Sequence, residues 1–141
     1  MPSPILTPVI ALVLWTLVMG VWLYATRIPA LKRHNIVYDP YRPSEEFHAQ
    51  LPAETRWKAD NYDNLLEQPT LFYAVALTLA VLEAGSGFNA GLAWAYVALR
   101  IAHSLVQALI NKVMIRFPLY ALASLVLLIM TIRAAWIIFS A

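Results

Sequence analysis

The sequence has 141 residues, of which 61% are hydrophobic and only 13% are charged. This composition is typical of a membrane protein and argues against an ordinary soluble domain. The formal net charge of +2 is too small to indicate nucleic-acid binding, which we exclude. The chain has no cysteine, so it offers no disulfide, no thiolate metal site and no cysteine nucleophile. Any reactive thiol must come from a ligand.

The first predicted element is a membrane span over residues 8–28. Residues 1–26 carry no charged side chain. An uncharged segment of this length is long enough to cross about 30 Å of hydrocarbon as a helix. The segment lacks the basic start and the cleavage site of a secretory signal, so we expect a retained span. Residues 29–58 mix prolines with acidic and basic residues and are expected to form a cytoplasmic loop with room for a short surface helix.

The second span is predicted over residues 60–82. Its first two turns are polar, and the run TLFYAVALTLAVL that follows is apolar. Pro69 should kink the helix near that change, because proline removes a backbone donor and crowds the preceding turn. The sequence GSGFNAG at 85–91 then predicts a tight turn.

The third span is predicted over residues 91–111, with Arg100 near the middle of the membrane. The fourth is predicted over residues 117–139, with Pro118 suited to its first turn. The sequence therefore predicts an all-α protein, an integral membrane four-helix bundle in a single domain, residues 1–141.

The distribution of lysine and arginine predicts the orientation, because basic residues resist translocation. The connection after the first span holds Arg27, Lys32, Arg33, Arg42, Arg56 and Lys58. The short third connection holds Lys112 and Arg116, and the second holds no basic residue. We therefore expect a multi-pass protein of the bacterial inner membrane with both termini outside.

Two predicted spans carry polar residues at helical spacing. The second carries Asp60, Asn64 and Glu67, and the third carries Arg100, His103, Gln107 and Asn111. Each set falls on one helix face, so the two polar faces should meet. An arginine at the bilayer centre costs at least about 2.5 kcal/mol without a partner, which predicts an ion pair between Arg100 and Glu67.

A purely structural interpretation competes with a functional one. Polar groups between membrane helices often act only as interhelical contacts worth about 0.6 kcal/mol each, and this suffices for Ser104, Thr78 or Asn111 taken singly. The clustering of ionisable groups indicates a functional cavity instead. Glu83 and Arg133 fall on the outer side, where we interpret them as structural and expect Arg133 to reach the interface or to pair with Glu83.

Three segments, in this order, resemble the MAPEG family (membrane-associated proteins in eicosanoid and glutathione metabolism), in its bacterial type. They are NLLEQPTLF at 64–72, RIAHSLVQ at 100–107 and RFPLY at 116–120. They are similar to the family's asparagine, glutamate and proline on helix two, its Arg-x-x-His on helix three and its arginine before helix four. The resemblance implies a homotrimer in membrane lipid, with glutathione bound between neighbouring subunits near the cytoplasmic side.

The resemblance also implies roles for individual residues. Arg116 matches the arginine that stabilises the glutathione thiolate. The positions of ligand-binding residues are occupied by Asn64, Glu67, Arg100, His103, Gln107, Tyr120 and Arg27. Glutathione is the implied co-substrate, and no metal is implied. The chain departs from the family at Asp60, where members usually have arginine, at Asp63, and at Gln107, which replaces a tyrosine.

The function that the resemblance implies is a membrane glutathione S-transferase or peroxidase acting on small lipophilic substrates. A neighbouring arginine and the N-terminus of a helix would both favour the thiolate. The alternative is a non-catalytic scaffold or accessory subunit that binds lipid or another amphiphile, which Asp60 and Asp63 favour because carboxylates oppose an anionic ligand. A proton or ion path along Arg100, His103 and Glu67 is disfavoured, since one subunit offers no continuous relay.

Overall fold

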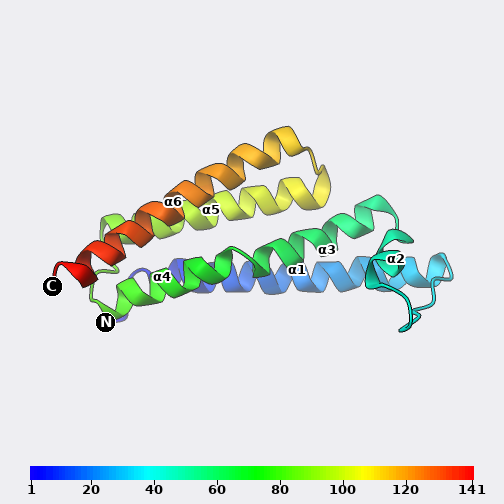
Figure 1. Ribbon diagram of the computed structural model, residues 1–141, viewed down its shortest axis with the longest axis horizontal. Helices are drawn as coiled ribbons and strands as arrows, with labels where there is room; N and C mark the ends of the chain where they lie inside the picture. The colour runs from blue at the N-terminus through cyan, green and yellow to red at the C-terminus, as the bar shows by residue number, and fades with distance from the viewer.

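The computed structural model describes all residues, 1–141, and is all-α (Figure 1). Its helices are α1 (Leu6–Arg33), α2 (Ser44–Ala49), α3 (Ala53–Leu66), α4 (Pro69–Val81), α5 (Phe88–Leu109) and α6 (Val113–Phe139). Three of them, α1, α5 and α6, are long and apolar enough to cross a membrane. The predicted fold class is therefore confirmed as far as all-α structure and membrane-spanning helices are concerned.

The first helix is apolar on both of its faces. Its inner face buries Leu12 and Met19, whereas Leu14 and Leu17 on its outer face are both 58% exposed. A helix that is apolar all round requires an apolar surrounding, which lipid or another subunit provides. The helix continues through Pro29 to Arg33, beyond the predicted end at residue 28, and basic side chains in its last turn suit the negative end of the helix dipole.

The predicted helix over residues 60–82 begins earlier, at residue 53, and is divided into α3 and α4. Pro69 is the first residue of α4, and the helical path is interrupted at Glu67, whose ψ of −97° lies outside the helical region. The kink predicted from Pro69 is thus confirmed, in the stronger form of a break. Since a helix end leaves backbone carbonyls without helical partners, the break exposes acceptors inside the bundle.

Figure 1 shows α1 running beside α3 and α4, with α5 and α6 forming an antiparallel pair against them. Both chain termini lie at one end of the bundle, which we call the terminal end. The other end, which we call the loop end, carries residues 34–52 with the short helix α2. There, α1 and α3 extend past the turn between α5 and α6, so the loop end is built mainly from the first half of the chain.

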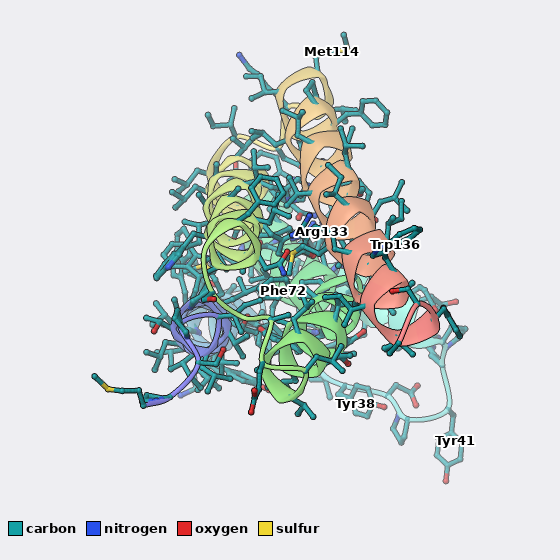
Figure 2. All side chains as sticks on the ribbon, turned by 90° about the vertical axis from the view of Figure 1, so that its left-hand side faces the viewer. Tyr38, Tyr41, Phe72, Met114, Arg133 and Trp136 are labelled. Atoms are coloured by element: carbon teal, nitrogen blue, oxygen red, sulfur yellow. The ribbon has the colours of Figure 1, made fainter.

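The bundle centre is closely packed around Phe72 (Figure 2). Phe72 is 0% exposed and stacks on Tyr96 of α5, with ring centroids 4.5 Å apart. Between α1 and α3, Gly20 allows a close approach of Tyr62. A Cβ added at Gly20 would lie 3.0 Å from the Tyr62 ring. Lipid is as apolar as these side chains, so close packing of this kind, rather than removal from water, holds the helices together.

Candidate functional site

Arg100 lies at the centre of the polar part of the bundle and is 0% exposed. Its Nη2 donates hydrogen bonds to the backbone oxygen of Asn64, at 3.1 Å, and to the side-chain Oδ1 of Asn64, at 2.9 Å. Its guanidinium also lies 5.5 Å from the centre of the Tyr120 ring. The Asn64 carbonyl belongs to the last turn of α3, so the helix break supplies the acceptor that the buried arginine needs.

The predicted ion pair between Arg100 and Glu67 is wrong within this chain. Glu67 is exposed, and no carboxylate lies within ion-pair distance of Arg100. The reason is the break itself, because Glu67 is the residue at which α3 ends and the backbone leaves the helical path. The Nε and Nη1 atoms of Arg100 have no hydrogen-bond partner, so Asn64 accepts hydrogen bonds from only one of the three guanidinium nitrogens.

The polar faces of α3 and α5 meet at Asn64, as their spacing predicted. While Asn64 Oδ1 accepts from Arg100, its Nδ2 donates to Oε1 of Gln107 at 3.3 Å. Asp60, predicted on the same face, does not take part: it is exposed and its Oδ1 lies 3.3 Å from Nε2 of His48. Asn64 therefore joins α3 to α5 through both ends of its amide.

A second polar cluster surrounds Gln68, which the sequence did not single out. Its Nε2 donates to Oγ of Ser124 at 2.8 Å and lies 3.5 Å from the Tyr120 hydroxyl. Its Oε1 accepts from the Tyr96 hydroxyl at 3.1 Å. The available signal was its place directly before Pro69, at the helix break that proline predicts, where polar groups are needed inside the bundle. Gln68 links α5 and α6 at the level of the break.

Four of the predicted site residues share one cavity of about 230 Å³ near the start of α6. Its walls are Asn64, His103, Val113, Arg116, Phe117 and Tyr120. His103 is buried, with its ring 5.8 Å from that of Tyr120. Arg116 lies in the first turn of α6, where its Nη1 donates to Oδ1 of Asn111 at 3.0 Å. Arg100 and Gln107 do not line this cavity but hold Asn64 in its wall.

Arg27 and Glu67 are not brought to this cavity within the chain. Arg27 lines a separate, open cavity of about 600 Å³ at the loop end, together with Arg56, Asp60 and Asp63. Its guanidinium lies 5.4 Å from the centre of the Phe47 ring. Asp60 and Asp63, the two acidic residues that differ from the family pattern, therefore line the cavity of Arg27 and not that of Arg116.

The structure shows no group of three or more His, Asp or Glu side chains arranged to hold a metal ion. The polar cavity instead combines a guanidinium, an imidazole, a phenol and an amide. These groups are suited to stabilising a ligand anion by hydrogen bonds and charge.

Long apolar helices that enclose a buried arginine, a histidine and paired amides define an integral membrane protein with an internal polar site. Comparison with protein-family models identifies the family: the model described as the MAPEG family matches residues 5–136, and the chain belongs to that family. The chain is therefore a membrane protein related to glutathione and eicosanoid metabolism, which confirms the predicted family. No curated protein and no solved structure matched the chain.

Proposed function

We propose that this chain is a membrane glutathione S-transferase or peroxidase that conjugates or reduces small lipophilic substrates. The observation that carries the proposal is the shared cavity in which Arg116, Tyr120, His103 and Asn64 meet at the start of α6. The cavity joins a cation to the N-terminus of a helix, and both favour a bound anion. Family membership supplies the context of glutathione chemistry.

Arg116 would act on the thiol of glutathione. A free thiol has a pKa of about 8.5, and a neighbouring arginine lowers that pKa so that the thiolate predominates at neutral pH. The Tyr120 hydroxyl accepts only a long contact from Gln68, so it is free to donate a hydrogen bond to the thiolate sulfur, with its proton staying on the phenol oxygen. The thiolate then forms a bond to the electrophilic atom of the acceptor, whose leaving group departs with the electron pair.

The Asn64 amide would orient the peptide rather than react. Both of its polar ends are already held by Arg100 and Gln107, so it is a fixed wall of the cavity. A preorganised wall lowers the entropy lost when ligand and protein groups are brought together. In this proposal, Arg100 is a positioning residue that acts through Asn64.

We further propose that α3 and α4 together form one span of a four-helix subunit and that three subunits assemble. The cavity of about 230 Å³ is smaller than the range of about 300–1,000 Å³ usual for ligand sites, so a neighbouring copy would complete it. Exposed Glu67 and the Arg27 cavity are available for that role. Exposed apolar side chains on α1 and α6 supply surfaces for neighbours and lipid.

The proposed orientation places both termini outside the bacterial inner membrane and the loop end in the cytoplasm. The basic residues of the first and third connections support it. The structure adds that residues 34–52 and the turn between α5 and α6 lie at the same end of the bundle. The Arg116 cavity would then open near the cytoplasmic side, where glutathione is supplied.

A non-catalytic scaffold or accessory subunit is the second candidate. It is favoured by Asp60 and Asp63, which line the same cavity as Arg27 and Arg56. Carboxylates beside the two arginines would oppose a ligand that itself carries two carboxylates. In this alternative the chain would bind lipid or another amphiphile without turning it over.

The test is the variant Arg116→Ala, assayed in detergent with glutathione and 1-chloro-2,4-dinitrobenzene. We expect conjugation to fall by about 10²-fold or more, the range for removal of one preorganised electrostatic group. The remaining activity should rise with pH, because the thiol must then ionise unaided. Arg116→Lys should recover only part of the rate, since lysine lacks the planar fork of arginine.

A matched control is Arg33→Ala, which removes an exposed arginine that makes no ion pair. It should leave the rate unchanged. If Arg116→Ala conjugates as fast as the parent, Arg116 is not catalytic. If neither protein exceeds the uncatalysed rate although both bind glutathione or lipid, the scaffold alternative replaces the enzyme.

A further inference from the structure

Arg133 on α6 is a charged residue that the proposed reaction does not use. It lies at the terminal end, far along the bundle from the start of α6, where Arg116 is located (Figure 1). Figure 2 views the molecule from that end, with Arg133 and Trp136 on the turns of α6 nearest the viewer. Arg133 is exposed, and its position in the penultimate turns of a membrane-spanning helix places it near the lipid interface.

The guanidinium of Arg133 is held on one side only. Its Nε donates to Oδ1 of Asn89, and its carbon lies 4.9 Å from the centre of the Phe88 ring. Asn89 is itself buried and fixed, because its Nδ2 donates to the backbone oxygen of Ala84 at 2.8 Å. The guanidinium is therefore anchored in direction, while neither of its terminal nitrogens makes a hydrogen bond within the chain.

No carboxylate neutralises this arginine. The pairing with Glu83 that the sequence suggested is wrong, since no ion pair includes either residue. Glu83 follows the end of α4 in a left-handed conformation, with φ of 57°, and is exposed. Asn89 at the start of α5 accepts the hydrogen bond from the Arg133 guanidinium instead. A positive charge without a counter-ion thus remains at the membrane surface.

A cavity of about 230 Å³ lies directly against this charge. Its other walls are the side chains of Ile132, Trp136 and Ile137. Ile132 is 58% exposed and Trp136 is 75% exposed, so the cavity opens toward the surroundings of α6 and not toward the bundle centre. One end of the cavity is cationic and the remainder is apolar, and this polarity matches an amphiphile with an anionic head.

We propose that Arg133, Trp136 and the adjoining isoleucines form a binding site for an anionic phospholipid in the leaflet at the terminal end. The two terminal nitrogens of Arg133 would meet the phosphate, since a guanidinium pairs with phosphate through two parallel hydrogen bonds. The acyl chain would lie along Ile132 and Ile137, and the Trp136 ring would sit at headgroup level, as interfacial tryptophans do.

The source of the ligand follows from where the site lies. The residues are on a helix that spans the membrane, and the phosphate groups that meet such a helix near its end are those of lipids. A net negative headgroup should be preferred over a zwitterionic one by about fivefold, the effect of one basic residue near a charged membrane surface. This inference rests on the membrane placement of α6 and is independent of the proposed enzymatic activity.

The test uses protein reconstituted into phosphatidylcholine vesicles that contain a brominated phospholipid, which quenches tryptophan fluorescence on contact. The chain has five tryptophans, so the signal of Trp136 is obtained as the difference between the parent and Trp136→Phe. Brominated phosphatidylglycerol should quench Trp136 at about a fivefold lower mole fraction than brominated phosphatidylcholine. The same difference is then measured in the Arg133→Gln background.

We expect Arg133→Gln to abolish the preference and Arg133→Lys to retain only part of it, because lysine keeps the charge but not the fork. The control Arg42→Gln removes an equal charge from an exposed pair with Asp39 and Glu46 and should keep the full preference. If Arg133→Gln does not reconstitute, the test relies on Arg133→Lys. An anionic-lipid preference in Arg133→Lys equal to that of the parent would refute the bidentate site.

Two further results would overturn the proposal. An equal preference in the parent and in Arg133→Gln would mean that the general charge of the protein, and not this site, attracts the lipid. Absence of quenching by either brominated lipid would mean that another protein surface, such as a second copy of the chain, covers Trp136. Quenching that depends on Arg133 and on the anionic headgroup supports the site.

Discussion

Replacing Asn64 by leucine tests whether hydrogen bonds, and not an ion pair, stabilise the buried charge of Arg100. Leucine keeps a similar volume but removes the Oδ1 that accepts from Arg100 and the Nδ2 that donates to Gln107. Because Arg100 is 0% exposed, water cannot replace the lost acceptor without rearrangement of the bundle. The backbone oxygen of residue 64 still accepts from Nη2, so the guanidinium does not lose every partner.

The expected loss of stability follows from these two bonds. A hydrogen bond to a charged group contributes about 1.5–3 kcal/mol, whereas a neutral hydrogen bond between membrane helices averages about 0.6 kcal/mol. Asn64→Leu should therefore lower the free energy of unfolding by about 2–3.5 kcal/mol. This is less than the roughly 3–5 kcal/mol for complete isolation of a buried charge, because one acceptor remains.

The assay is equilibrium unfolding of the detergent-solubilised protein, followed by helical circular dichroism as the fraction of a denaturing detergent increases. The decisive comparison is Glu67→Gln, which removes the carboxylate that the sequence had assigned to Arg100. Since Glu67 is exposed and makes no ion pair, this variant should stay within about 0.5 kcal/mol of the parent. If Glu67→Gln loses as much as Asn64→Leu, the reasoning is refuted.

A double variant measures the interaction between Arg100 and Asn64 apart from the effect of each single change. Removing both partners of a buried polar pair is often tolerated, whereas removing one is not. Arg100→Met combined with Asn64→Leu should therefore recover part of the stability lost by either change alone, with a coupling energy of about 1.5 kcal/mol or more. Strict additivity of the two single changes would show that Asn64 and Arg100 do not interact.

Gln68→Leu should lower the free energy of unfolding by about 1–3 kcal/mol in the same assay, because it leaves the Tyr96 hydroxyl without its acceptor. A stability equal to that of the parent would contradict the role of Gln68 as a link between α5 and α6. Cysteines introduced at Ser3 and Ser44 of the cysteine-free chain should react with an impermeant maleimide from opposite sides of the membrane. Labelling of Ser44 from the outside would reverse the proposed orientation.

The features that follow from local chemistry could be predicted from the sequence. Pro69 predicts an interruption because it lacks a backbone donor, and the structure interrupts the helix there. The spacing of Asn64 and Gln107 on their helices predicts that they face each other, and they form a hydrogen bond. Family membership was likewise predicted from short motifs on three segments, and the family model matches residues 5–136.

The partners of the charged residues could not be predicted in this way. Charge complementarity predicted Glu67 as the partner of Arg100 and offered Glu83 as one of two alternatives for Arg133, but the structure provides the amides Asn64 and Asn89. In both cases the acidic residue stands where a helix ends, and the direction of its side chain depends on local backbone angles. Helical spacing says nothing about residues outside the helix, so a pairing rule based on it fails at such positions.

The separation of the predicted site residues into two cavities has a similar cause. Arg27 lies at the end of the first predicted span and Arg116 just before the fourth, so both fall beside the basic connections at one membrane side. The sequence therefore places them at the same depth but gives no distance across the bundle. The structure shows that α1 and α3 continue beyond the turn between α5 and α6, which leaves Arg27 in the cavity at the loop end and Arg116 in its own.

The buried arginine also sets the order in which the helices can enter the membrane. α5 is the least apolar of the three helices long enough to span the membrane, and transfer of its arginine alone into lipid would cost about 2.5–3.5 kcal/mol. The groups that cover Arg100 come from α3 and α6. If α3 and α4 form a span as proposed, we expect α5 to leave the translocon only when α3 is already beside it and α6 follows as the second arm of a hairpin.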